Sequence, residues 1–259
     1  GVNSVARGNP EASLKSGTAL ALVQSMALQF TSGLQQSYVE LIEDVAAFEA
    51  WKKSNVIAQK QAGYVAIGIK VALGDFYTDK ARALAHLIKN YGANELRFTL
   101  RQDILIRNIK EENLPFFYQE LAKLDFVTLG YNTINDVTAC PGTDTCNLGI
   151  ASSTGIAVEL ERVLATEYPQ YSNNQEITIK ISGCMNACGQ HNMAEIGFQG
   201  MSINSGKLVA PALQVLLGGG NLGNGQGRFS DKVIKIPSRR GPEALRLILN
   251  DFQANANGL

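Results

Sequence analysis

The four cysteines of the chain fall into two close pairs, and no other cysteine is present. Cys140 and Cys146 form a C-x5-C pair, and Cys184 and Cys188 form a C-x3-C pair. Each pair stands in a glycine-containing turn that follows an apolar segment. Four thiolates brought to one point would bind a soft metal centre, which means an iron–sulfur cluster, zinc or copper(I).

Three other interpretations of the cysteines remain open. Two structural disulfides would suit an oxidising compartment and usually a much smaller domain. A four-thiolate zinc site prefers C-x2-C pairs, and both gaps in this chain are wider. Four unrelated buried cysteines would rarely fall into two pairs flanked by glycine. The pattern favours a four-thiolate iron–sulfur cluster.

Length and charge exclude several classes of protein. A chain of 259 residues can bury a sizeable core in one large or two small domains. The 23 basic and 23 acidic residues cancel, so no global field attracts nucleic acid or an anionic membrane. Apolar runs such as residues 19–23 are too short to span a bilayer, and the given sequence does not open with the basic-then-apolar pattern that would predict a signal peptide. We expect a cytoplasmic, reducing setting with no nucleic-acid or membrane partner.

The first 61 residues are predicted to be a helical lead-in and a connector. Apolar residues between Leu22 and Val45 recur at three- and four-residue steps, which predicts one or two amphipathic helices. Residues 51–63 are basic, polar and aperiodic, which is typical of an extended connector. The chain begins with Gly1 rather than Met, which suggests a processed product or a fragment.

Residues 62–128 are predicted to form a ferredoxin-like half-domain, a name that refers to the fold and not to a cluster. Thr78 is expected to cap a helix that stops at Gly92, and Asn113 and Pro115 are expected to open another. The expected order is a strand at 64–71, a helix at 78–91, strands at 96–100 and 104–108, and a helix ending near 124.

Residues 129–259 are predicted to form a second, mixed α/β domain, so that the fold class is α+β. The alternating segment 176–182 reads as a half-buried strand that delivers Gly183 and Cys184 from its end. The glycine-rich run 216–225 lacks the Lys-Ser/Thr of a nucleotide loop and is predicted to be a flexible loop. The other expected elements are helices at 154–167 and 242–252 and strands at 194–200, 207–209 and 229–236.

Two cysteine-bearing segments closely resemble the paired motifs of the sirohaem-dependent nitrite and sulfite reductases. They read ACPGTDTCNLG at 139–149 and ISGCMNACGQHNMAEIGFQG at 181–200. Residues 62–125, with FTLRQ at 98–102, resemble that family's ferredoxin-like half-domain. The resemblance covers about residues 48–253. It matches the second of the two pseudo-symmetric halves that full enzymes of this family contain.

The resemblance implies two cofactors, a [4Fe-4S] cluster and sirohaem. Cys140, Cys146, Cys184 and Cys188 would hold the cluster, and Cys188 would also bridge to the sirohaem iron. The implied reaction is the six-electron reduction of nitrite to ammonia or of sulfite to sulfide.

Sirohaem carries many carboxylates, so its site needs cations and N–H donors. Arg101 is the first candidate because Arg101-Gln102 coincides with the family's Thr-x-Arg-Gln motif, and Gln102 and Arg97 are further candidates. Asn186 could hydrogen-bond the cluster or macrocycle, although it could equally be a plain turn residue. His191 could reach a sirohaem carboxylate, although a lone histidine is more often structural. Arg107 and Lys110 lie on the same two-strand segment, and Arg97 and Arg107 could equally be solvated strand residues.

The basic residues that grip the substrate anion in this family come mainly from the first half, which this chain does not match. The resemblance therefore implies a first half, a partner subunit or a second copy that completes the site. It also implies a single-electron donor, either ferredoxin or a flavoprotein. Two alternatives stay open: a non-catalytic [4Fe-4S] electron-transfer or scaffold subunit, and a tetrapyrrole-pathway oxygenase of the same family. The sequence does not separate nitrite from sulfite.

Overall fold

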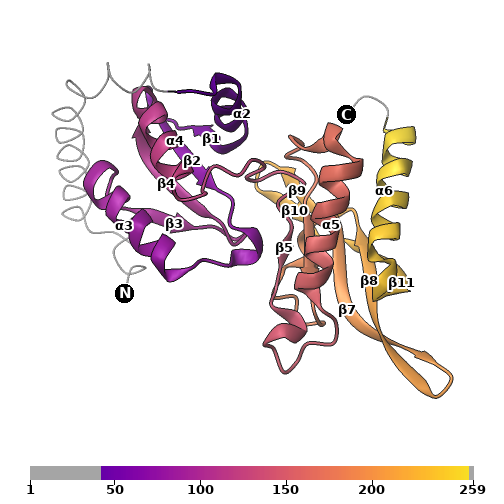
Figure 1. The fold of residues 1–259 in the computed structure, drawn as a ribbon. Coiled ribbons are helices and arrows are strands. Elements are labelled where there is room, and N and C mark those ends of the chain that lie inside the picture. Colours follow the sequence, from indigo (N-terminus) through magenta and orange to yellow (C-terminus); the bar gives the residue numbers. More distant parts are fainter. Residues whose placement is uncertain (1–41, 257–259) are drawn as a thin grey trace, which may run out of the picture. The chain divides into compact units, whose positions relative to one another are not determined.

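The computed structural model describes residues 42–256, and these divide into two compact units (Figure 1). One unit holds residues 42–67, 77–97 and 105–127, and the other holds residues 68–76, 98–104 and 128–256. Most of the helical stripe predicted between Leu22 and Val45 lies outside the described residues. None of the helices formed by residues 42–256 has the length and apolar character needed to cross a bilayer.

A four-stranded sheet with the order β1-β2-β4-β3 forms the first half of the described chain. Its strands are β1 (Val56–Ala58), β2 (Tyr64–Ile69), β3 (Leu96–Phe98) and β4 (Ile104–Lys110). The helices are α2 (Val45–Asn55), α3 (Thr78–Tyr91) and α4 (Leu114–Ala122). From β2 onward the order is strand, helix, two strands and helix, which confirms the predicted ferredoxin-like pattern.

Two local predictions in this half need correction. The segment predicted as an extended connector contains the last turn of α2 and the edge strand β1, which pairs antiparallel with β2. A three-residue strand is too short to show an alternating pattern in the sequence. Thr78 is not the cap of α3, because the helix already includes it and Tyr77 stands at the N-cap without a side-chain bond. The predicted stop at Gly92 is confirmed.

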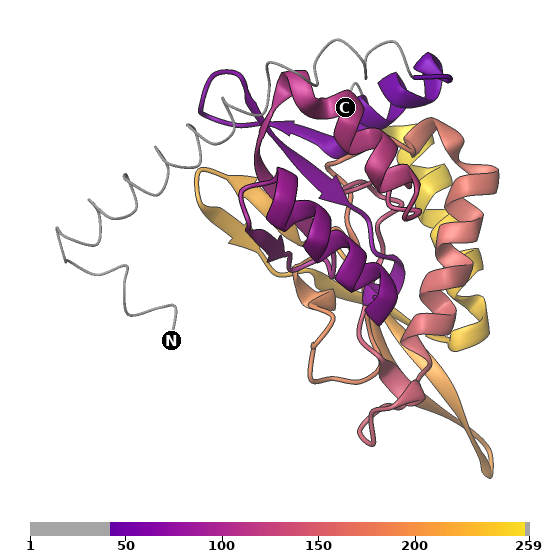
Figure 2. The same ribbon diagram turned by 60° about the vertical axis from the view of Figure 1, so that its left-hand side comes forward.

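The second half is built on a five-stranded sheet with the order β11-β8-β7-β6-β5. The strands are β5 (Thr138–Ala139), β6 (Ile179–Ser182), β7 (Ile196–Ser205), β8 (Leu208–Leu217) and β11 (Asp231–Pro237). β5, β6 and β7 run parallel, whereas β8 pairs antiparallel with both β7 and β11. Figures 1 and 2 show the long β7–β8 hairpin reaching past the rest of this sheet.

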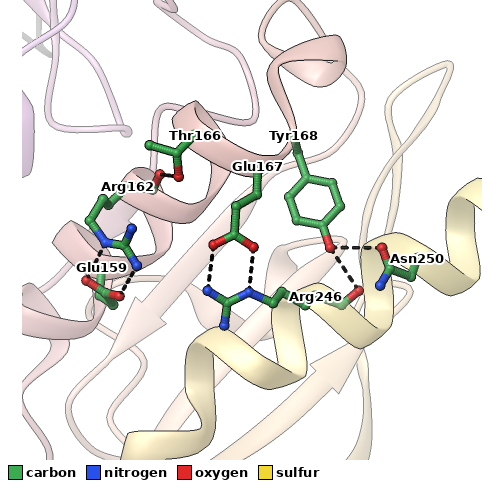
Figure 3. A network of polar contacts seen from close by, with 7 residues as sticks. All are labelled: Glu159, Arg162, Thr166, Glu167, Tyr168, Arg246 and Asn250. Atoms are coloured by element: carbon green, nitrogen blue, oxygen red, sulfur yellow. Dashed lines mark hydrogen bonds and ion pairs between the residues drawn. The ribbon is translucent and has the colours of Figure 1, made fainter.

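Helices α5 (Ser153–Glu167) and α6 (Gly241–Asn255) lie side by side against the sheet (Figures 1 and 2). Their buried faces meet the strands in one hydrophobic core, to which Leu160, Phe198 and Leu245 each contribute a fully buried side chain. Polar contacts also join the two helices (Figure 3). Arg246 binds Glu167 through two hydrogen bonds of 2.6 Å, and the Tyr168 hydroxyl donates to Asn250 at 2.9 Å.

The glycine-rich run 216–225 was predicted to be a flexible loop, but parts of it form strands. Leu216 and Leu217 end β8, and the run continues into β9 (Gly220–Gly223). β9 forms a small hairpin with β10 (Gln226–Arg228), which follows the run. The turn between them consists of Asn224 at φ +50° and Gly225 at φ +75°. Asn-Gly with positive φ at both positions is the typical two-residue hairpin turn, and this dipeptide was the overlooked signal.

The close packing of Tyr131 on Gly68 predicts the effect of a substitution on stability. A Cβ added at Gly68 in β2 would lie 2.3 Å from Cδ1 of the Tyr131 ring, which is itself buried. Gly68→Ala therefore forces the ring or the backbone to move, and we expect it to lower the free energy of unfolding by about 1–3 kcal/mol. Urea denaturation measures the loss. Gly227→Ala is the control, because its added Cβ meets nothing closer than 3.5 Å; equal stability of the two variants would contradict this packing.

Candidate functional site

The first cysteine of each pair stands where a strand of the second sheet ends. β5 and β6 are parallel neighbours, with Ala139 opposite Ile181. Gly183 and Cys184 follow β6, as predicted, and Cys140 directly follows β5, a strand that was not predicted. Because parallel strands bring their carboxyl ends to one edge of a sheet, both cysteines lie at that edge. The Cys140 N–H donates to the Ile181 carbonyl at 3.2 Å, and the Gly183 N–H donates to Cys140 Sγ at 3.1 Å.

The segment between the first pair and α5 is held against the second pair by backbone bonds. The N–H groups of Ile150 and Ala151 both donate to the Gly183 carbonyl, at 2.8 and 3.1 Å. Ser153, the first residue of α5, donates its hydroxyl to the Cys140 carbonyl at 2.6 Å. Its Oγ also lies 3.6 Å from Cys140 Sγ. The two cysteine segments are thus a single hydrogen-bonded structure.

Glycine is required where these segments touch. A Cβ on Gly183 would lie 2.7 Å from Gly142 Cα and 2.8 Å from the Ala151 carbonyl oxygen. Gly142 has φ +53°, a conformation that favours glycine, and a Cβ there would lie 2.2 Å from Ser153 Oγ. A Cβ on Gly142 would also lie 2.8 Å from the Ala151 carbonyl oxygen and 2.9 Å from the Ser153 backbone nitrogen. Since both glycines have backbone atoms this close, rotation of the Ser153 side chain alone cannot make room for a Cβ.

All four cysteines are free thiols, but they differ in exposure. Cys184 is buried and Cys140 is half-buried, whereas Cys146 and Cys188 are exposed on their loops. Within residues 42–256, no group of three or more His, Cys, Asp and Glu side chains is arranged so that it could hold a metal ion. The structure therefore brings Cys140 and Cys184 to one sheet edge, and the four-cysteine ligand set stays a prediction.

Arg101 and Gln102 occupy the turn between β3 and β4, within the second compact unit. The Arg101 N–H donates to Thr99 Oγ1 at 3.2 Å. Its Nη1 atom is buried and has no hydrogen-bond partner in the described part of the chain. Gln102, at φ +73°, accepts from the Ala139 N–H at 3.0 Å and so ties this turn to the residue before Cys140. A buried, unpaired guanidinium nitrogen suits an anionic ligand from outside the chain.

Lys180 is a buried cation near the cysteine segments that the sequence did not indicate as a site residue. The segment 176–182 was predicted to be half-buried, but the observed strand is β6 and all four of its residues are buried. β6 lies between two parallel neighbours, and such strands are covered on both faces. Lys180 Nζ donates to Gln190 Oε1 at 2.8 Å. Burial, and then the charge of Arg101, lower the pKa of Lys180.

Two family models match this chain in consecutive segments. The "Nitrite/Sulfite reductase ferredoxin-like half domain" matches residues 57–124, and the "Nitrite and sulphite reductase 4Fe-4S domain" matches residues 130–258. The chain belongs to the nitrite and sulfite reductase family. The second match contains both cysteine pairs and the β5–β6 edge.

Curated relatives in the nitrite and sulfite reductase family cover both named activities. The chain is 27% identical to the ferredoxin--nitrite reductase of Synechococcus elongatus over 65% of its length, which is 33% of that relative. It is 30% identical to the chloroplastic ferredoxin--nitrite reductase of Betula pendula over 65% of its length, which is 29% of that relative. It is 29% identical to sulfite reductase (ferredoxin) 2 of Mycolicibacterium paratuberculosis over 64% of its length, which is 30% of that relative.

A solved structure supports the same family. The Mycobacterium tuberculosis NirA protein superposes with a TM-score of 0.63 at 26% identity, covering 78% of this chain and 37% of NirA. Dissimilatory sulfite reductase I shares the fold, with a TM-score of 0.58 at 11% identity. The chain spans about a third of the length of the curated relatives that it matches.

The predicted cofactors, a [4Fe-4S] cluster and sirohaem, are confirmed as those that this family implies. The residues present fit both. Four free thiols and an N–H group that donates to sulfur suit a cluster, whose sulfurs commonly accept such bonds. The unpaired Arg101 nitrogen and the buried Lys180 ammonium suit the carboxylates of sirohaem.

The remaining candidates of this reductase-family chain differ in their surroundings. Asn186 is exposed on the loop between Cys184 and Cys188, where it is available to a ligand. His191 is 3% exposed, and burial lowers its pKa, so a neutral imidazole is expected at pH 7. Its Nδ1 atom has no hydrogen-bond partner among residues 42–256. The role of both residues stays a prediction.

Three basic residues of the strand pair already have acidic neighbours. Arg97 is exposed and lies 3.1 Å from Glu95, which also lies 3.8 Å from Arg107. Lys110 lies 3.2 Å from Glu112. These pairs suit solvated strand residues, so Arg101 is the stronger candidate of the two predicted arginines.

Proposed function

We propose that this chain is the part of a nitrite or sulfite reductase that carries the [4Fe-4S] cluster and sirohaem. The observation that carries the proposal is the parallel β5–β6 edge, where Cys140 and Cys184 each follow a strand end and the Gly183 N–H donates to the Cys140 sulfur. Its place inside the matched 4Fe-4S domain supports the same assignment. The substrate is either nitrite or sulfite, since relatives named for each are similar to this chain to the same degree.

Cys140, Cys146, Cys184 and Cys188 are the proposed cluster ligands, with Cys188 also facing the sirohaem iron. When bound, the coupled centres supply the electrons and the bond breaking for a six-electron reduction of nitrite to ammonia or of sulfite to sulfide. The chain contributes Cys140 and Cys184 at the sheet edge and the exposed thiols of Cys146 and Cys188 on the adjoining loops. The backbone N–H of Gly183 stabilises negative charge on the Cys140 sulfur.

Arg101 and Lys180 are the proposed anchors for the anionic side of sirohaem. The Arg101 nitrogen is desolvated and unpaired within the described residues, so binding a carboxylate costs it no existing partner. Asn186, Gln102 and His191 are proposed as further contacts, and Arg97 as a weaker one.

The remaining parts of the reaction are proposed to come from other molecules. Ferredoxin is the proposed electron donor, because the names of several relatives contain it. A first half, a partner subunit or a second copy is proposed to supply the residues that grip the substrate. A cytoplasmic setting is proposed because it would keep the four thiols reduced.

The proposed function is tested on the polypeptide encoded by the full natural reading frame, purified anaerobically. We expect sirohaem absorption and turnover of nitrite or sulfite with reduced ferredoxin as donor. A cluster without tetrapyrrole or turnover would instead support an electron-transfer subunit. Conversion of a corrin precursor without reduction of either anion would support the oxygenase alternative.

Replacing Arg101 tests the proposed sirohaem contact. Arg101→Gln keeps a hydrogen-bonding side chain but removes the charge, so we expect sirohaem to bind about 10- to 100-fold more weakly. Titration of the anaerobic protein with sirohaem, followed by absorption, measures the affinity. Arg162→Gln, which removes an exposed arginine paired with Glu159, is the control and should change it less than about twofold. Equal affinity of both variants would rule out the Arg101 contact.

A further inference from the structure

Two aspartates are buried together in the second compact unit, and neither was singled out by the sequence. Asp103 is 0% exposed and immediately precedes β4, whereas Asp136 is 4% exposed and lies just before β5. Asp103 Oδ1 accepts from the Val71 N–H at 2.8 Å, and Asp136 Oδ2 accepts from the Asn132 N–H at 2.9 Å. Asp103 Oδ2 is buried and has no N–H or O–H donor among residues 42–256. The carboxyl group of Asp136 is close enough to raise the pKa of Asp103, both through its charge and as a side-chain hydrogen-bond partner.

The charged groups around this pair do not neutralise it. Lys70 Nζ lies 3.0 Å from Glu161 and donates to the Asn135 carbonyl, so its charge is already engaged. Two buried carboxylates in contact cannot both be ionised without a large electrostatic cost. Burial, and then Asp136, raise the pKa of Asp103 to about 9. The titratable and charged groups that face the pair are Lys70 beyond β2, Arg101 in the turn, Tyr131 in the loop, Lys180 in β6 and Glu161 in α5.

The pair stands at the base of the turn that carries the proposed sirohaem contact. Thr99 closes this turn, because its Oγ1 accepts from the N–H groups of Arg101 and Asp103 and its N–H donates to the Asp103 carbonyl. Gln102 fastens the turn to Ala139, the residue before Cys140. Asp103 and Asp136 make a second connection between the same two segments.

We propose that Asp103 and Asp136 share one proton, and that this shared proton holds the turn with Arg101 and Gln102 against the segment that leads into Cys140. Asp103 is thereby a positioning residue for the anionic cofactor. The positioning rests on the proposed function, whereas the sharing of the proton does not. The two parts are therefore tested by separate readouts on the full chain.

The first test is the pH dependence of unfolding. The pKa of Asp103 is about 9 in the folded chain, against an ordinary value of 3.8. The folded state therefore keeps a proton that the unfolded state releases, and the stability that this proton provides is lost as pH rises toward 9. Asp103→Asn keeps a hydrogen-bond donor without titrating. Between pH 5.5 and 8, the unfolding constant of the wild type relative to this variant should rise about tenfold for each pH unit. A ratio independent of pH overturns the shared proton.

A second readout needs no variant. The infrared spectrum of the wild-type chain should contain a protonated carboxylic acid band at pH 7, which disappears as the pH is raised past about 9. If Asp103→Asn does not fold, this band alone tests whether Asp103 and Asp136 share a proton. Its absence at pH 7 overturns the proposal.

The positioning is tested by sirohaem titration at pH 7. Asp103→Asn should bind sirohaem within about twofold of the wild type, and Asp103→Ala at least about tenfold more weakly, because only the amide can replace the shared hydrogen bond. Equal affinity of these two variants overturns the positioning. If the wild type and both variants all fail to bind sirohaem, the proposed function is overturned. The infrared band and the unfolding ratio would still test whether the two aspartates share a proton.

Discussion

Cys140→Ser is expected to remove nearly all of the cluster from the anaerobically reconstituted chain. The wild type should hold about four iron atoms per chain, the content of a cluster with four thiolate ligands. Serine keeps the size and hydrogen bonds of the position but replaces a soft thiolate with a hard hydroxyl, a poor ligand for iron in such clusters. Iron and acid-labile sulfide analysis of the desalted protein measures the loss.

Thr143→Ser is the matched control for this substitution. Thr143 lies on the same exposed loop between Cys140 and Cys146, and the change leaves all four thiols in place. This variant should retain the iron content of the wild type. Retention of wild-type iron by Cys140→Ser would show that Cys140 is not a ligand.

Gly183→Ala is expected to lower the free energy of unfolding by about 3 kcal/mol and to prevent cluster loading. The added Cβ would lie within 2.8 Å of backbone atoms of both Gly142 and Ala151. The first cysteine loop packs directly on Gly183 at the end of β6, so the two cysteine segments must move apart to make room for the added methyl group. Urea denaturation of the apo chain gives the stability loss, and iron analysis after reconstitution gives the loading.

The control for the glycine substitution is again Gly227→Ala, which should change stability by no more than about 0.5 kcal/mol. It adds the same methyl group to a strand position where the nearest atom lies 3.5 Å away. A Gly183→Ala chain as stable as this control, with normal iron content, would contradict the described contact between the cysteine segments.

Local sequence signals correctly predicted the ends of helices and strands where a single Gly or Pro, or a short alternating segment, determines the backbone conformation. Gly92 ends α3, Pro115 lies in the first turn of α4, and Gly183 follows β6 directly. Each of these depends on backbone conformation or on the run of residues beside it. The cysteine spacing likewise indicated a soft-metal site and led to the family that the comparisons support.

Features that depend on contacts between distant segments could not be predicted in this way. Lys180 alternates with isoleucines as a solvent-facing residue would, and only the pairing of β6 between β5 and β7 buries it. Asp103 and Asp136 are far apart in sequence, so nothing local indicates that their carboxyl groups meet. Gly68 is an ordinary strand glycine until the Tyr131 ring is placed against it.

The arrangement of the four thiols is tested most directly by Mössbauer spectroscopy of the wild-type chain reconstituted anaerobically with enriched iron and sulfide. We predict the spectrum of a single [4Fe-4S] cluster, with about four iron and four sulfide per chain. A chain that takes up no iron and keeps four titratable thiols, or one that binds a single zinc ion instead of a cluster, would contradict the proposed four-thiolate [4Fe-4S] site.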